Sequence, residues 1–156
     1  MQDYNIYLQT EIVGPVKTTS KYGYVIELTE RENVINTLTE IGCMKDATCY
    51  RLLVAAVCRA LDKIQKKSRV TIYTDSMYLQ NAFAEDWIGQ WATAGWKNKK
   101  KQPVKNDDIW KLVAEKADKH EISIIRQQRH QYSSWLMDQM QKEDIPPGKS
   151  RIIRPT

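Results

Sequence analysis

The sequence has few of the features that mark membrane proteins, disulfide scaffolds or disordered chains. Its 156 residues include six glycines, five prolines and three cysteines. No apolar run approaches the roughly 20 residues that a membrane-spanning helix needs. The first residues, MQDYNIYLQT, also lack a basic stretch followed by an apolar one. We therefore expect a cytoplasmic protein that makes no contact with a membrane.

The cysteines are odd in number and match no zinc-ligand spacing, so Cys43, Cys49 and Cys58 are interpreted as reduced thiols. The apolar share of 42% and the charged share of 28% describe a folded globule. A chain of this length suits one domain that buries roughly two thirds of its unfolded surface. We therefore expect a single domain with its own core.

Hydrophobic periodicity predicts an α/β fold. Three antiparallel strands joined by short turns are expected over residues 4–9, 22–28 and 34–41. An amphipathic helix over residues 53–64 and a buried parallel strand over residues 70–74 should follow. The remaining elements are three helices, a strand and a last helix, expected over residues 76–83, 87–91, 106–120, 121–126 and from 133 onward.

The segment from residue 70 to 110 is the most informative part of the sequence. It places a buried strand that ends in Asp75 before a tryptophan-rich helix and a lysine-rich loop, as TIYTDSMYLQNAF, WIGQWATAGWK and KKQPVKNDDIW. This order resembles ribonuclease H of type 1, the endonuclease that cuts the RNA strand of RNA/DNA hybrids. The resemblance implies a ribonuclease H-like domain over residues 1–143, followed by a basic, proline-containing tail over residues 144–156. The implied fold is a mixed five-stranded sheet, three strands antiparallel and then two parallel, flanked by helices.

The resemblance also implies a catalytic site in which four carboxylates hold two divalent ions, Mg²⁺ or Mn²⁺. Asp75 and Asp138 match two of these positions, but Gln9 and Arg51 occupy the other two. The four side chains sum to about −1 instead of about −4, which neutralises two divalent cations poorly. We expect no high-affinity metal ion, weak binding at most at Asp75 and Asp138, and hydrolysis that is lost or strongly reduced.

Three alternatives remain open for the side chains that complete the site around Asp75 and Asp138. Glu11 lies two residues after Gln9 on the same strand face and is a candidate displaced ligand. Glu40 and Asp46 are weaker candidates. Arg51 is hypothesised to bridge Asp75 and Asp138 in place of a metal, because a guanidinium can bond two carboxylates.

His130 matches the family histidine that precedes the last helix, to which proton transfer or product release is ascribed. Three tryptophans and a basic loop resemble the protrusion that some family members lay across the DNA strand. Lysines there would neutralise phosphates. The expected nucleic-acid-binding residues are Trp87, Trp91, Trp96, Lys97, Lys99, Lys100, Lys101 and Lys105. The alternative interpretation is a solvated loop beside tryptophans that pack in the core.

The leading hypothesis is a pseudoenzyme, a ribonuclease H-like domain that binds RNA/DNA hybrid or another duplex without efficient cleavage. One alternative is an active hybrid endonuclease with displaced ligands, and another is a protein-interaction module on the same fold. A reverse transcriptase or other mobile-element protein is a candidate partner, and a monomer is expected. The segments that replace the family's RNA-contacting residues, TEIVGPVKTTSKYGY and KDATCY, leave the preference between RNA and DNA open.

Overall fold

The computed structural model describes residues 1–11 and 14–154 and contains a mixed six-stranded sheet of order β5-β4-β1-β2-β3-β6. β1 pairs in parallel with β4 and antiparallel with β2, so it lies at the junction of the two pairing modes. The strands are β1 (Gln2–Thr10), β2 (Thr18–Glu30), β3 (Asn33–Ala47), β4 (Ser68–Thr74), β5 (Glu121–Arg126) and β6 (Ser150–Ile153). The predicted α/β fold, with three antiparallel strands before two parallel ones, is confirmed.

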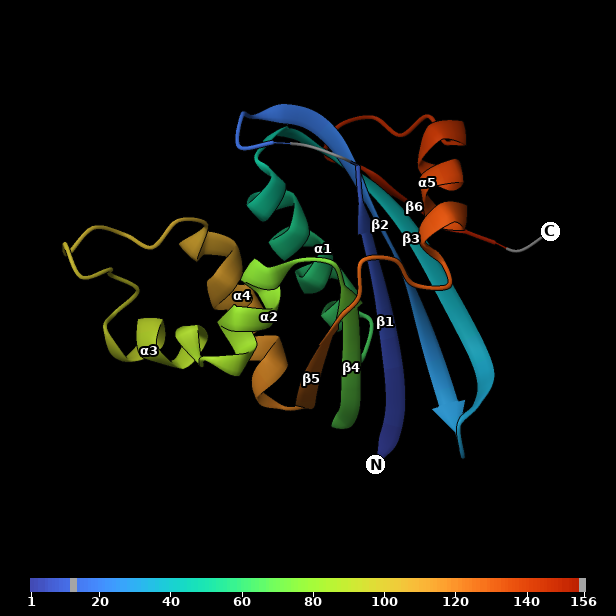
Figure 1. Ribbon diagram of the computed structural model, residues 1–156, viewed down its shortest axis with the longest axis horizontal. Coiled ribbons are helices and arrows are strands. Elements are labelled where there is room, and N and C mark those ends of the chain that lie inside the picture. The colour runs from blue at the N-terminus through green and yellow to red at the C-terminus, as the bar shows by residue number, and fades with distance from the viewer. Residues whose placement is uncertain (12–13, 155–156) are drawn as a thin grey trace.

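Helices lie on both faces of the sheet (Figure 1). The helices are α1 (Cys49–Asp62), α2 (Met77–Ala84), α3 (Trp87–Thr93), α4 (Asp107–Asp118) and α5 (Ser133–Lys142). The group formed by α1 to α4 lies on one face, and among the described residues α5 is the only helix on the other face. None of the helices in the described part of the chain is long and apolar enough to cross a membrane.

Alternation along β1 separates two cores. Ile6 and Leu8 pack with the apolar face of α1, whereas Tyr7 packs with Leu136 and Met140 of α5. Because successive strand residues point to opposite faces, one strand contributes to both cores. The side of β1 that carries Tyr7 also carries Gln9, which places Gln9 on the face that α5 covers.

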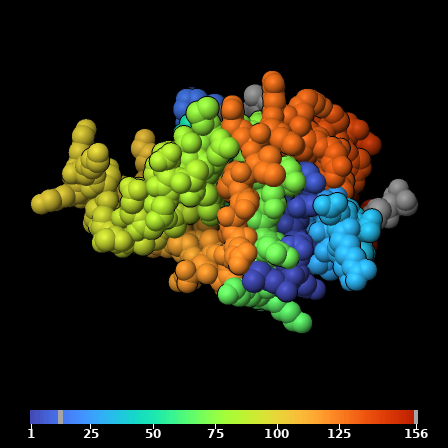
Figure 2. Space-filling view, turned by 60° about the horizontal axis from the view of Figure 1, so that its bottom comes forward, coloured from blue at the N-terminus to red at the C-terminus, as the bar shows by residue number. Residues whose placement is uncertain are grey.

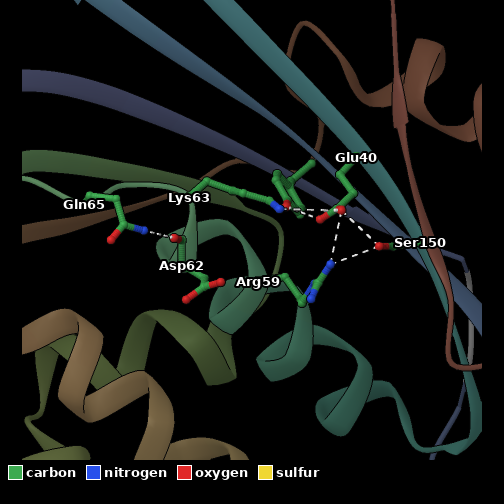
Figure 3. A network of polar contacts seen from close by, with 7 residues as sticks. Glu40, Arg59, Asp62, Lys63, Gln65 and Ser150 are labelled. Atoms are coloured by element: carbon green, nitrogen blue, oxygen red, sulfur yellow. Dashed lines mark hydrogen bonds and ion pairs between the residues drawn. The ribbon is translucent and has the colours of Figure 1, made fainter.

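β6 is an addition to the predicted sheet, because the sequence indicated only a basic tail after residue 143. It pairs antiparallel with β3, and Ile153 is buried against the α5 core. Ser150 Oγ donates to Glu40 Oε2 at 2.9 Å, and Arg59 reaches both groups (Figure 3). Four residues with one buried isoleucine carry too weak a pattern to predict a strand, and the pairing depends on the free edge of β3. Pro155 and Thr156, at the end of the predicted tail, lie outside the described residues.

Candidate active site and nucleic-acid interface

A shallow cavity of about 240 Å³ lies at the carboxyl ends of β1 and β4. These strands are parallel, so their ends meet at one edge of the sheet, where α/β proteins commonly bind ligands. Gln9, Glu11 and Asp75 line the cavity together with Tyr50 at the start of α1. The structure therefore brings the predicted first-strand and fourth-strand positions to one place.

The two β1 side chains at this cavity already bond to the protein. Glu11 Oε1 accepts a hydrogen bond from the backbone N–H of Lys21 at 2.5 Å. Gln9 Nε2 donates to the carbonyl of Thr10 at 3.1 Å. Glu11 lies at the cavity as the displaced-ligand hypothesis requires, but one of its oxygens is engaged by β2.

Arg51 points away from the predicted carboxylates, so the hypothesis that it bridges Asp75 and Asp138 is wrong. Its guanidinium forms two parallel bonds to Asp108, at 3.0 and 2.8 Å, and a third to Asn106 Oδ1 at 3.2 Å. Asp108 lies in the first turn of α4, where a carboxylate also suits the helix dipole. The side chain thus ties α1 to the start of α4.

Asp138 lies on the exposed side of α5 and is not among the residues that line the cavity. Across residues 1–11 and 14–154, no three His, Cys, Asp or Glu side chains are grouped closely enough to hold a metal ion. At the two remaining positions that the resemblance assigns to carboxylates, the amide of Gln9 brings no negative charge, and the guanidinium of Arg51 is a permanent cation that cannot ligate a metal ion. These residues do not fit the two-ion site that the family implies.

Glu40 does not approach the cavity, so that weaker candidate ligand is excluded. It is 3% exposed and faces α1, where Arg59 and Lys63 lie 3.2 and 3.8 Å away. Burial alone raises the pKa of Glu40, but bonds from Tyr24 and Ser150 and the charges of Arg59 and Lys63 outweigh it and lower the pKa. The role that this geometry supports is structural.

His130 is fixed against β1. Its Nδ1 accepts from the backbone N–H of Tyr132 at 3.1 Å, which assigns the proton to Nε2, and Nε2 donates to the carbonyl of Leu8 at 2.7 Å. Its ring also packs on Tyr7 with centroids 5.2 Å apart. Burial lowers the pKa of His130, against the opposing effects of the Leu8 bond and the Asp75 charge. The catalytic roles of His130, Asp75 and Asp138 stay predictions.

The three tryptophans of the predicted interface are half-buried and pack against the main core. Trp91 lies at their centre, with ring centroids 6.1 Å from Trp87, 6.5 Å from Trp96 and 5.5 Å from Trp110. Trp91 also lines a cleft, so core packing and exposure to a ligand coexist in this residue. Trp87 and Trp96 are mostly buried against the same core.

The basic segment Lys97–Lys105, here called the lysine loop, is a short hairpin. Asn98 organises it: its Oδ1 accepts from the backbone N–H groups of Lys100 and Gln102, at 2.9 and 3.0 Å. Its five lysines are exposed, and the segment projects from the body of the molecule (Figures 1 and 2, yellow). The projection presents positive charge to solvent on a structured base.

A cleft of about 660 Å³ lies between the lysine loop and the start of α1. Tyr50 and Tyr78 form part of its wall and stack on each other with ring centroids 4.1 Å apart. Trp110 Nε1 donates to Tyr78 Oη at 3.1 Å and holds that ring in place. Sequence reasoning missed both tyrosines. The available signal in the sequence was a tyrosine directly before Arg51 and another tyrosine three positions after Asp75.

A family model described as RNase H matches residues 9–134 of this chain. Ribonuclease H of Moorella thermoacetica is 35% identical over 89 residues, which is 57% of this chain and 59% of that protein. The chain thus spans less than two thirds of the length of this relative.

Two solved structures share the fold. LC9-RNase H1, described as a type 1 RNase H with the type 2 active-site motif, gives a TM-score of 0.72 at 16% identity, over 92% of this chain and 74% of that chain. The foamy viral protease-reverse transcriptase, in a structure with RNA/DNA hybrid, gives 0.57 at 22% identity, over 81% of this chain and 17% of that chain.

Proposed function

This chain belongs to the ribonuclease H family, and we propose that it binds RNA/DNA hybrid or another duplex while hydrolysis is lost or strongly reduced. The proposal rests on Arg51, which the resemblance assigns to a family carboxylate position and whose guanidinium bonds to Asp108. A two-ion mechanism needs several carboxylates around the reacting phosphate, and here a permanent cation stands in that set.

Binding is supported by the lysine loop and by the aromatic cleft beside it. Exposed lysines neutralise phosphates without reading sequence, and aromatic rings support sugars and bases. The foamy viral neighbour, solved with an RNA/DNA hybrid, agrees with this substrate class and with a reverse transcriptase as a candidate partner. The cytoplasmic location and monomeric state remain predictions.

The deciding experiment is a cleavage assay on a fluorescent RNA/DNA hybrid in Mg²⁺ and in Mn²⁺, run beside an anisotropy measurement of binding. We expect binding without turnover above background. Cleavage that disappears in Asp75→Asn would overturn the loss of hydrolysis. The absence of salt-dependent binding to any duplex would favour the protein-interaction module.

A second candidate function is an active nuclease that uses Glu11 beside Asp75, because both line the same cavity. It predicts divalent-dependent cleavage that is lost in Glu11→Gln. The engineered pair Gln9→Asp with Arg51→Glu provides a positive control for the site. Binding of a metal at ten times its Kd would stabilise this variant by about 1.4 kcal/mol, seen as a rise in melting temperature. An unmoved melting temperature would show that the cavity itself has been reshaped.

A further inference from the structure

The loop between β5 and α5, residues 127–132, is attached to the sheet edge that carries Asp75. It crosses the carboxyl ends of β4 and β1 on its way to α5 (Figure 1). Its attachments are Gln127 N–H to Thr74 O at 2.8 Å, Arg126 Nε to Asp75 O at 3.2 Å and His130 Nε2 to Leu8 O at 2.7 Å. These bonds place the loop beside the candidate active site.

The far end of the same loop is fixed by Glu27, a strand residue that is 2% exposed. Glu27 accepts from Tyr132 Oη at 2.5 Å and from Gln131 Nε2 at 3.1 Å. Burial, together with this carboxylate, raises the pKa of Tyr132 to about 12, so the hydroxyl remains a donor. The loop is therefore held at both ends, and side chains on it start from a fixed base.

Two exposed arginines lie here: Arg126 is the last residue of β5, and Arg129 lies within the loop. Within the described residues neither has a carboxylate partner, whereas four other arginines, Arg51, Arg59, Arg69 and Arg151, each form an ion pair. Arg126 bonds only the backbone carbonyl of Asp75, and Arg129 contacts the Ser134 hydroxyl. Two arginines thus remain outside any ion pair of the described residues at this edge of the site.

The cavity at Asp75 and the cleft beneath the lysine loop share two lining residues, Cys49 and Tyr50. They therefore adjoin each other along the start of α1. Lys105 lines the cleft on the side of the lysine loop, and the arginine pair lies on the side of Asp75. A polyanionic strand that lay along both hollows would meet positive charge at each end.

We propose that Arg126 and Arg129 form a second phosphate-binding point, which holds the backbone of a nucleic-acid strand beside Asp75 without a metal ion. A guanidinium presents a planar fork of donors that matches two phosphate oxygens. This inference rests on the proposed function, because it assigns how a strand that already contacts the lysine loop is held at the former metal site.

The test is anisotropy of a fluorescent RNA/DNA hybrid in EDTA over a series of salt concentrations. The double variant Arg126→Gln with Arg129→Gln should bind more weakly, with a slope of log affinity against log salt that is shallower by about 1.8. Arg31→Gln with Arg154→Gln is the matched control, since it removes the same charge from two other arginines that form no ion pair within the described residues. Arg31 lies in the turn after β2, and Arg154 follows β6. The control should leave the slope close to that of the unaltered chain.

Two further variants keep the result interpretable. Arg129→Gln alone leaves the Arg126 attachment of the loop intact and should remove about half of the effect. The variant Arg126→Lys with Arg129→Lys keeps both charges. It should retain most of the salt slope but bind with reduced affinity, because lysine lacks the guanidinium fork. Hybrid binding that is unchanged in both the double and the single glutamine variants would overturn the inference and leave the proposed function standing. No hybrid binding by the unaltered chain would overturn both.

Discussion

Arg51 shows how one residue changes what this site can do. At the start of α1 its side chain can turn toward the cavity or toward α4, and it turns toward α4, where Asp108 and Asn106 accept its donors. The resemblance assigns Arg51 to a carboxylate position, whereas the direction of its side chain depends on which acceptors the fold places nearby. Asp75 consequently lies at the cavity without an ion pair to Arg51.

Replacing Arg51 with alanine should lower the free energy of unfolding by about 0.5 to 1 kcal/mol, since the pair with Asp108 is partly exposed and such pairs contribute little. Chemical denaturation measures this change. A double-mutant cycle with Asp108→Ala should give a coupling of about 0.5 kcal/mol. The matched cycle with Asp75→Ala should give none, and a larger coupling to Asp75 would contradict the observed direction of Arg51.

The loop from residue 127 to 132 is held in place although it has no regular secondary structure. His130 bonds β1 and the next turn through both ring nitrogens. Glu27 then secures the following residues from β2. An element without regular secondary structure is thus fixed by contacts from two strands, and fixed arginines on it can bind an anion with little loss of entropy.

His130 should titrate below its ordinary pKa of about 6.5, because burial disfavours the imidazolium. With a lowered folded pKa, its contribution to stability is complete above the unfolded pKa and is lost as the pH falls toward the folded pKa. Imidazole ¹⁵N shifts give the midpoint, and the protection factor of the Tyr132 amide should fall over the same pH range, because protonation removes its Nδ1 acceptor. His130→Asn assigns the signals by removing one of two histidines. A midpoint above 6.5 would contradict the buried, neutral ring.

β6 is the other element that only its partner explains. Ser150 brings its hydroxyl to Glu40, and Arg59 completes the network from α1 (Figure 3). Glu40→Gln should lower the free energy of unfolding by about 2 kcal/mol, because Ser150 and Arg59 lose a buried charged acceptor. The matched control is Glu143→Gln, whose ion pair with Arg151 is more exposed and should contribute about 0.5 kcal/mol.

The same network gives an acid dependence. The pKa of Glu40 is lowered in the folded state, so its contribution is present above the unfolded value of about 4.5 and is lost as the pH falls through the folded pKa. Urea unfolding at pH 6 and at pH 3 should therefore show a smaller loss of stability in Glu40→Gln than in the unaltered chain. Equal losses would show that other carboxylates account for the acid sensitivity.

At the scale of the whole molecule, charge is distributed unevenly. The net charge is only +5, but five lysines lie between residues 97 and 105 on a segment that projects from the body (Figure 2). Aromatic residues line the adjoining cleft, and the arginine pair lies beyond it, beside Asp75. This distribution favours a long polyanion over a small anionic ligand.

Replacing Lys99, Lys100 and Lys101 together with glutamine should make the slope of log affinity against log salt shallower by up to about 3 for an RNA/DNA hybrid. The change should add to that of the arginine variants, because the two groups contact different phosphates. A control that replaces Lys66 and Lys67 with glutamine, near the amino end of β1, removes two charges away from the cleft and should leave the slope close to that of the unaltered chain. An unchanged slope in the loop variant would show that the lysine loop is only a solvated surface.

The sequence by itself determined the family and the order of the elements from β1 to α5. These features are local: hydrophobic period, capping residues and short motifs such as YTDS are written in neighbouring residues. The prediction that two of four family carboxylates are missing likewise rests on the sequence alone.

Tertiary structure decided where the side chains point. Arg51 bonds to Asp108, and His130 bonds to Leu8. Glu40 lies on the face of the sheet that α1 covers, and Ser150–Ile153 forms a strand. Each outcome depends on a partner between 57 and 122 positions away in the chain or on a free strand edge. A one-residue shift in pairing would exchange the two faces of the sheet. Such choices are made by competition between distant acceptors and donors, which no local pattern records.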